Sequence, residues 1–373
     1  MVGPLDKKIV LDPAPKLFDK DENDGLFLHC VMEQEKHSCI IPMKNDQPRT
    51  TSELSRRDFI GMSAAFCVPL LARASVSTLK ESVKMGLITD LHHDLIHDGK
   101  TRLKAFLAHS RQVQTDGLIQ LGDFTFPDEK NQDVIDLFNQ AHKTTLHVIG
   151  NHDTDNGHTK QQCLDRWGMP ARYYTRKVKG IWFIVLDGND TGSPDHKGGY
   201  PAYINPEQVA WLKTQLQQIK EPIVIVSHQP LIGALAVNNA AEMQAVLAGA
   251  ADRIIVAING HTHVDSLIYE SGIPYLTINS ASYFWIGDKY LHESYPKAIH
   301  EAHEWMSRMC PYRDPLYTVM TIDPATMTVQ ITGKPSTWVG KSPTELGFTD
   351  EYKPLRVGEE IVPFIRKSTV KQH

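Results

Sequence analysis

Histidine and aspartate residues follow several short apolar runs of this chain, in positions where they could bind metal ions. The stretch AINGHTHVD, residues 257–265, ends an apolar run at a glycine and then presents His261 and His263, separated by one residue. The run KMGLIT is followed in a similar way by Asp90 and His92. Positions i and i+2 of an extended chain point to the same side, so each pair is expected to project together.

Three further segments offer metal ligands: GD at 122–123, GNHD at 150–153 and SH at 227–228. The complete set is Asp90, His92, Asp123, Asn151, His228, His261 and His263. Imidazole and carboxylate ligands suit zinc, manganese or iron. Seven ligands are too many for one ion with an open position, but they fit two ions that share a bridging carboxylate. A histidine on its own is more often structural, and it is the repetition over five segments that indicates a metal centre.

The segments that carry these ligands are typical of buried strands. Short apolar runs occur at 84–90, 116–123, 144–153, 180–190, 222–230 and 253–263. Helical patterns lie between them, and strands that alternate with helices indicate an α/β fold. In open α/β sheets, ligands bind beyond the carboxyl ends of the strands. The seven side chains are therefore expected at one edge of the fold.

Two of the helices can be predicted in some detail. Residues 129–143 place Val134, Leu137, Phe138 and Ala141 on one apolar stripe. The segment 205–220 begins with Asn205 as N-cap, and Gln208 stands in the capping-box position. Nearer the C-terminus, residues 316–333 predict a β-hairpin that turns at DPATM.

The motifs DLH at 90–92, GD, GNHD, SH and GHTH at 260–263 resemble those of the calcineurin-like metallophosphoesterases, in the order found in that family. They are most similar to the bacterial phosphodiesterase and phosphatase branch. The resemblance implies a four-layer α-β-β-α sandwich with a dinuclear metal site at the C-terminal edge of the strands. It also implies that Asp90, His92 and His263 hold one ion, that Asn151, His228 and His261 hold the other, and that Asp123 bridges them.

The same resemblance implies an enzyme, a metal-dependent phosphoric ester hydrolase. A metal-bound hydroxide would attack a small phosphomonoester or phosphodiester, with two divalent or mixed-valence ions of Mn, Fe or Zn as cofactor. His152 would protonate the leaving alkoxide, and Asp153 would orient the ring of His152. The alternative for Asp153 is a turn residue or a local cap. The alternative functions are a non-catalytic metal-binding domain and, more narrowly, a cyclic-nucleotide phosphodiesterase.

Residues 50–74 are predicted to be an export signal. Arg56 and Arg57 precede an apolar run from Phe59 to Ala72, and a small-residue cleavage site follows. The paired arginines resemble a signal of the twin-arginine type. An amphipathic or buried helix is the alternative. We therefore expect an exported protein, periplasmic or extracellular, that meets the membrane only through the export machinery.

The chain of 373 residues divides into four predicted segments. They are an N-terminal extension (1–49), the signal (50–74), the phosphoesterase domain (83–333) and a C-terminal tail (334–373). A mis-assigned start would explain the extension, since translation from Met43 gives a natural signal; a cytoplasmic leader is the alternative. The net charge of −5 shows no basic footprint, so no nucleic-acid partner is expected. After removal of the signal only Cys163 and Cys310 remain, either paired or free, and the sequence does not indicate an oligomeric state.

Overall fold

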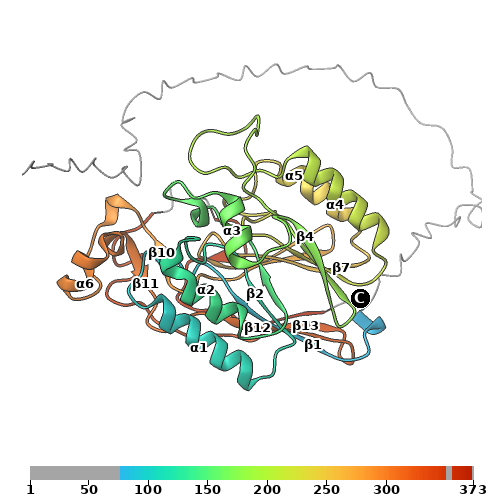
Figure 1. The fold of residues 1–373 in the computed structure, drawn as a ribbon, viewed down its shortest axis with the longest axis horizontal. Coiled ribbons are helices and arrows are strands. Elements are labelled where there is room, and N and C mark those ends of the chain that lie inside the picture. Colours follow the sequence, from blue (N-terminus) through green and yellow to red (C-terminus); the bar gives the residue numbers. More distant parts are fainter. Residues whose placement is uncertain (1–75, 350–354, 372–373) are drawn as a thin grey trace, which may run out of the picture. The chain divides into compact units, whose positions relative to one another are not determined.

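The computed structural model describes residues 76–349 and 355–371, which form two β-sheets and the helices that cover them (Figure 1). The first sheet is built from β1 (Val83–Ile88), β2 (Gly117–Gln120), β3 (Thr145–His147), β12 (Thr318–Asp323), β13 (Thr328–Ile331) and β15 (Ser368–Lys371). Its order is β15-β13-β12-β1-β2-β3. The second contains β4 (Tyr174–Val178), β5 (Ile181–Val185), β6 (Ile223–Val226), β7 (Ile254–Asn259), β8 (Asp265–Glu270), β9 (Ile273–Thr277) and β14 (Glu359–Glu360). Its order is β14-β8-β9-β7-β6-β5-β4.

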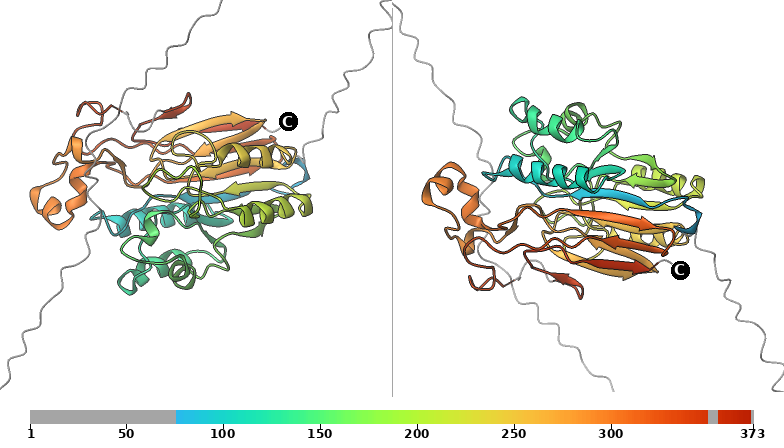
Figure 2. Two further views of the ribbon diagram at one scale, coloured as in Figure 1. Left: turned by 90° about the horizontal axis from the view of Figure 1, so that it is seen from above. Right: turned by 90° about the horizontal axis from the view of Figure 1, so that it is seen from below.

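Helices cover the outer faces of both sheets. The first sheet is covered by α1 (Gly99–Gln112), α2 (Gln132–Asn139) and α3 (Lys160–Trp167), which Figure 2 shows on one side of the strands. The second is covered by α4 (Pro206–Gln218) and α5 (Ala240–Ala248). The helix α6 (Lys297–Ala302) lies near a separate ribbon of β10 (Tyr283–Trp285) and β11 (Met309–Pro311) (Figure 1). Single 3-10 turns occur at Val76–Thr78, Glu129–Asn131, His152–Thr154, Asp288–Tyr290 and Glu304–Arg308. The predicted α-β-β-α sandwich is confirmed.

The two sheets pack through alternate residues of their strands. In β6, Val224 and Val226 face the core between the sheets, whereas Ile223 and Ile225 face the helices α4 and α5. The period of two follows from the pleat of a strand, and a strand buried on both faces is apolar throughout. This is why the predicted strands appear in the sequence as continuous apolar runs.

Parallel pairing brings the strand ends together. Strands β1, β2 and β3 are parallel neighbours in the first sheet, and β5, β6, β7 and β9 are parallel neighbours in the second. Each strand ends a few residues before the ligand residues that follow it: β1 ends at Ile88, β2 at Gln120 and β7 at Asn259. The ligand residues therefore stand in the loops that leave the sheets.

The predicted hairpin is confirmed as the antiparallel pair β12 and β13. Beyond it, β15 pairs with β13, and β14 pairs with β8. The side chain of Val370 in β15 is buried in the core between the sheets. Residues 355–371 thus contribute strands to both sheets, although they belong to the segment 334–373 that is predicted to be a C-terminal tail.

The predicted capping box of α4 is only half correct. The side chain of Asn205 accepts a hydrogen bond from the backbone N–H of Gln208 (2.9 Å), as expected for an N-cap. The Gln208 side chain does not return to Asn205; it is buried and exchanges two hydrogen bonds with the backbone of Asp187 (2.8 and 2.9 Å). The backbone of Asp187 is buried where β5 ends, and there Gln208 satisfies both of its polar groups.

The predicted signal at 50–74 lies outside the described residues. In the part of the chain that the structure describes, no helix is long and apolar enough to span a membrane. Cys163 and Cys310 are both buried and free, which resolves the alternative that the sequence left open.

Candidate metal centre

The ligand residues stand on unusual backbone conformations. Positive φ angles are found at Asp90 (51°), His92 (47°), Asp123 (50°), His261 (74°) and His263 (54°). Few residues other than glycine adopt this left-handed region, and such strain of about 1–3 kcal/mol per residue persists mainly at functional sites. The expectation that each pair projects from extended chain is therefore wrong. These side chains converge because tight left-handed turns follow the strands.

Asp90, His92 and His263 form the first cluster, and all three are buried. The Nε2 atom of His263 lies 3.2 Å from Asp90 Oδ1 and 3.2 Å from His92 Nε2. A backbone N–H from the other cluster also reaches Asp90, because the amide of His261 donates to Asp90 Oδ2 (3.0 Å).

Asp123, His228 and His261 form the second cluster. The Nε2 atom of His228 lies 3.2 Å from Asp123 Oδ2 and 3.2 Å from His261 Nδ1. Asn151 joins them, with its Oδ1 also 3.2 Å from His228 Nε2. The structure thus brings all seven predicted ligand residues into two adjacent groups.

Asp123 stands between the two clusters. Its Oδ2 atom is 3.2 Å from His228 Nε2 in its own cluster and 3.6 Å from His92 Nε2 in the other. Its Oδ1 atom accepts a hydrogen bond from the backbone N–H of His152 (2.9 Å), which fixes the orientation of the carboxylate. This is the position that a bridging carboxylate needs.

Two glycines allow the loops to approach this closely. A Cβ atom at Gly260 would stand 2.0 Å from Thr89 Oγ1 and 2.6 Å from Asp90 Oδ2. A Cβ atom at Gly150 would stand 2.1 Å from Asp123 Oδ1. No side chain fits at either position, so the glycines before GHTH and GNHD are required by close packing against the ligand carboxylates.

Neither carboxylate pairs with a lysine or arginine of residues 76–349 or 355–371. Among the described residues, every ion-pair partner of Asp90 and Asp123 is a histidine. Burial works against the charged forms, but His263 and His228 hold the pKa of Asp90 at about 2. Burial also disfavours charge on His228, yet Asp123 and Asp90 raise its pKa to about 9. Buried carboxylates require compensating positive charge at this position.

The donor set fits metal ions. His228 Nδ1 donates to the backbone carbonyl of Leu121 (2.8 Å), which leaves the lone pair of Nε2 facing the cluster. That lone pair then meets oxygens of Asp123 and Asn151, and only a cation or a proton makes such an arrangement favourable. Nitrogen and oxygen donors of this kind suit zinc, manganese or iron. Each cluster therefore matches the ligand set of one ion.

His152 lies beside the clusters without belonging to either. Its ring meets that of His92 edge-on at 5.3 Å between centroids, and 27% of its side chain is exposed. Its Nδ1 atom lies 2.7 Å from Asp155 Oδ2 and 3.1 Å from the hydroxyl of Tyr200. Burial opposes the charged form, but Asp123 and then Asp155 outweigh it and raise the pKa of His152.

The predicted role of Asp153 is corrected by the structure. Its carboxylate is buried and accepts hydrogen bonds from backbone N–H groups of Asp123, Phe124, Thr125 and Gly150. It therefore ties the GD loop to the GNHD loop and does not reach the ring of His152. The partner of that ring is Asp155, because one 3-10 turn, His152–Thr154, places residue i+3 beneath residue i.

Asp155, Tyr200 and Tyr283 also lie beside the centre, and sequence reasoning missed the first two of them. The buried ring of Tyr283 packs against His92 (5.1 Å between centroids) and His263 (4.9 Å). The i+3 spacing from His152 was a local signal for Asp155. Tyr200 lies in the glycine-rich loop 187–203, but no sequence signal distinguishes this tyrosine from the other residues of the loop.

Comparisons with known proteins support the fold. Residues 83–265 match the family model described as Calcineurin-like phosphoesterase. A dimetal phosphatase from Danio rerio is similar in structure, with 14% identity and a TM-score of 0.50 over 70% of this chain and 100% of that one. GAP50 of Plasmodium is 14% identical, with a TM-score of 0.48 over 74% of this chain and 89% of that one. A purple acid phosphatase from yellow lupin is also 14% identical, with a TM-score of 0.42 over 67% of this chain and 51% of that one. A search of curated proteins gave no match.

Proposed function

We propose that the chain is a calcineurin-like phosphoesterase, as the match of residues 83–265 indicates, and that it hydrolyses a small phosphomonoester or phosphodiester with two bound metal ions. The observation that carries this proposal is the pair of buried ligand clusters joined through Asp123. Strained backbone at five ligand residues and glycines that admit no side chain support the same conclusion.

The seven predicted residues would hold the ions. Asp90, His92 and His263 would bind one, and Asn151, His228 and His261 would bind the other. Asp123 would contact both. When bound, divalent zinc, manganese or iron ions would act as Lewis acids on the phosphate and acidify the attacking water.

His152 is the residue that we propose as general acid. Its Nδ1 is occupied by Asp155, so Nε2 is the nitrogen available to a leaving-group oxygen. Its position beside His92 and its partial exposure support this role, because a substrate phosphate that met the clusters would also approach His152. A histidine in this role contributes about 10²–10⁴-fold to the rate.

The experiment uses protein stripped of metal and then reloaded with zinc, manganese or iron. Release of p-nitrophenol from p-nitrophenyl phosphate and from bis(p-nitrophenyl) phosphate is measured. Hydrolysis should require metal, and His152→Ala should reduce it while the metal stays bound, by up to about 10²–10⁴-fold for an ester whose leaving group needs a proton. A protein that binds metal but hydrolyses neither ester under any loading is a non-catalytic metal-binding domain, and the proposal is then wrong.

We also propose that the mature protein acts outside the cytoplasm. This proposal rests only on the sequence of residues 50–74. Replacing both Arg56 and Arg57 by lysine preserves charge but should block a twin-arginine route. The precursor should then accumulate in the cytoplasm on cell fractionation. Unchanged export of the Lys-Lys form would rule out the twin-arginine assignment.

A further inference from the structure

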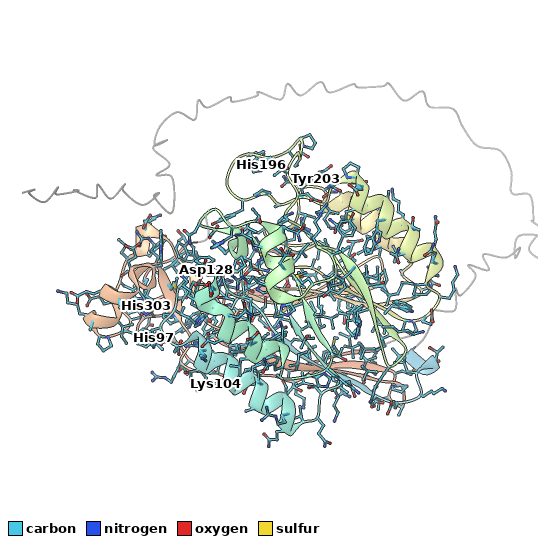
Figure 3. All side chains as sticks on the ribbon, in the orientation of Figure 1. His97, Lys104, Asp128, His196, Tyr203 and His303 are labelled. Atoms are coloured by element: carbon cyan, nitrogen blue, oxygen red, sulfur yellow. The ribbon has the colours of Figure 1, made fainter. Side chains whose placement is uncertain are left out.

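The loop at 187–203 is closed at its base and contacts neighbouring segments through Ser193 and Tyr200. It leaves β5 and returns to α4, and its ends are joined where Tyr203 N donates to Gly188 O (2.7 Å) and Asp190 N donates to Tyr203 O (3.0 Å). In Figure 3 the loop, marked by His196 and Tyr203, extends away from the strands. Most side chains between these ends are exposed, so these few contacts decide where the loop lies.

Tyr200 connects this loop to the centre. Its hydroxyl donates to both carboxylate oxygens of Asp155 (2.8 and 3.0 Å), and its ring meets the ring of His152 edge-on at 4.7 Å between centroids. Tyr200 is 38% exposed, and its hydroxyl makes three polar contacts. A residue that only filled the core would not be placed in this way.

Asp155 receives two donors on one carboxylate. His152 Nδ1 approaches Oδ2 at 2.7 Å, and the tyrosine hydroxyl approaches both oxygens. Both contacts of His152 and Tyr200 can be satisfied together only if the ring carries its proton on Nδ1, because Asp155 is the acceptor for both. A carboxylate that holds one ring nitrogen fixes the orientation of the whole imidazole.

We propose that Asp155 and Tyr200 are positioning residues that hold His152 with Nε2 turned to the reacting phosphate. This inference rests on the proposed function. The ring has two rotatable bonds, and without Asp155 it would sample orientations in which Nε2 misses the leaving oxygen. Tyr200 makes the orientation depend on the 187–203 loop, so the acid is in place only when the loop lies against it.

A purely structural role predicts different behaviour. If the two hydrogen bonds only fasten the loop, their loss affects stability or substrate affinity equally for all esters. If they position a proton donor, their loss matters most when the leaving group needs a proton. Phenolate is a poorer leaving group than p-nitrophenolate and depends more on a proton donor. Comparing a phenyl ester with a p-nitrophenyl ester therefore distinguishes the two roles.

The test compares Asp155→Asn and Tyr200→Phe with matched controls. Asp195→Asn changes an exposed aspartate of the same loop, and Tyr269→Phe removes the hydroxyl of an exposed tyrosine in β8. The substrates are p-nitrophenyl and phenyl esters of phosphate, as monoesters or diesters according to which the wild type hydrolyses. Metal content is measured for every variant.

We expect Asp155→Asn to lower kcat on the phenyl ester by about 10–100-fold, with KM and metal content near the wild-type values. Tyr200→Phe should lower it by about tenfold, since it removes hydrogen bonds to a charged group. Both effects should be smaller on the p-nitrophenyl ester and should disappear when His152 is already alanine. Equal losses on both esters, or a further loss in the His152→Ala background, would overturn the proposal and leave the hydrolytic function intact.

A spectroscopic measurement does not depend on turnover. In zinc-loaded protein with isotope-labelled histidine, the Nδ1-bound proton of His152 should give a downfield signal that is absent from His152→Ala. Asp155→Asn should abolish or shift that signal, and Tyr200→Phe should shift it, whereas Asp195→Asn should not. A signal that Asp155→Asn leaves unchanged would refute the positioning role even if the wild type hydrolysed neither ester.

Discussion

At the scale of single residues, the centre is built from conformations and contacts that ordinary side chains avoid. Asp90 and Asp123 have left-handed backbone, are buried and have only histidines as ion-pair partners among the described residues. We attribute the backbone strain and the burial of the two carboxylates to the metal binding proposed for them. Cations would offset the cost of the buried carboxylates.

Gly260 provides a direct test of how tightly the centre is packed. In Gly260→Ala the new methyl group would overlap Thr89 Oγ1 and Asp90 Oδ2, so Asp90 must move. We expect the variant to bind less metal at the first cluster and to unfold at a lower temperature. Gly249→Ala is the control, because its Cβ would meet only Val246 O at 3.4 Å. Normal metal content in Gly260→Ala would show that Asp90 is not held in the way we describe.

His147, which is not one of the proposed metal ligands, makes the free energy of unfolding depend on pH. Burial lowers its pKa to about 3, and both ring nitrogens of the neutral form are used, Nδ1 by Gln120 (3.1 Å) and Nε2 by Asn139 (2.7 Å). An unfolded histidine takes up a proton below about pH 6.5, whereas the folded one does so only near 3. Stability that is present above pH 6.5 is therefore lost as the pH falls from 6.5 toward 3, by about 1.4 kcal/mol per pH unit.

We predict a loss of about 2 kcal/mol from this residue between neutral pH and about pH 5. In His147→Gln that part of the pH dependence should disappear, although the variant is less stable at neutral pH. Free energies of unfolding from urea titrations at the two pH values give the comparison. Parallel losses in the wild type and the variant would mean that His147 is protonated in the folded protein.

The seven ligand residues could be predicted because each follows an apolar run and the residue types themselves are metal ligands. Their grouping into two clusters could also be anticipated from the resemblance. The sequence does not decide whether Asp153 or Asp155 contacts the ring of His152, since both follow it within one turn. The choice depends on backbone N–H groups of the GD loop. They donate hydrogen bonds to the carboxylate of Asp153, which leaves Asp155 as the partner of the ring.

At the scale of elements, buried strands were predictable and edge strands were not. The run of residues 222–230 is apolar because β6 is covered on both faces. By contrast, β15 has one buried side chain, Val370, between polar neighbours, and it gives no periodic pattern. Its partner β13 determines its place, and that pairing is a long-range contact.

We predict that β15 is nevertheless needed for stability. Val370→Asp would bury a charge between the sheets at a cost of about 3–5 kcal/mol. Thr369→Asp, on the exposed face of the same strand, should be nearly neutral. Thermal unfolding measures both. Equal melting temperatures for the two variants would mean that β15 does not contribute to the core.

At the scale of the whole molecule, two sheets with parallel strands direct five loops to one edge. The first sheet supplies Asp90, His92, Asp123 and Asn151, and the second supplies His228, His261 and His263. Both clusters combine residues from both sheets, so neither sheet alone carries a complete site. Metal binding should therefore stabilise the packing of the sheets against each other, by about 2.7 kcal/mol at a hundredfold excess over Kd.

The central claim is that two ions bind and that Asp123 holds both. The most direct measurement is the metal content per chain, by elemental analysis after reloading and removal of free metal, in the wild type, Asp123→Asn and His152→Ala. We predict two ions in the wild type and in His152→Ala, and a loss from both clusters in Asp123→Asn, because its carboxylate faces His92 and His228 alike. One ion or none in the wild type, or two ions retained by Asp123→Asn, would contradict the account.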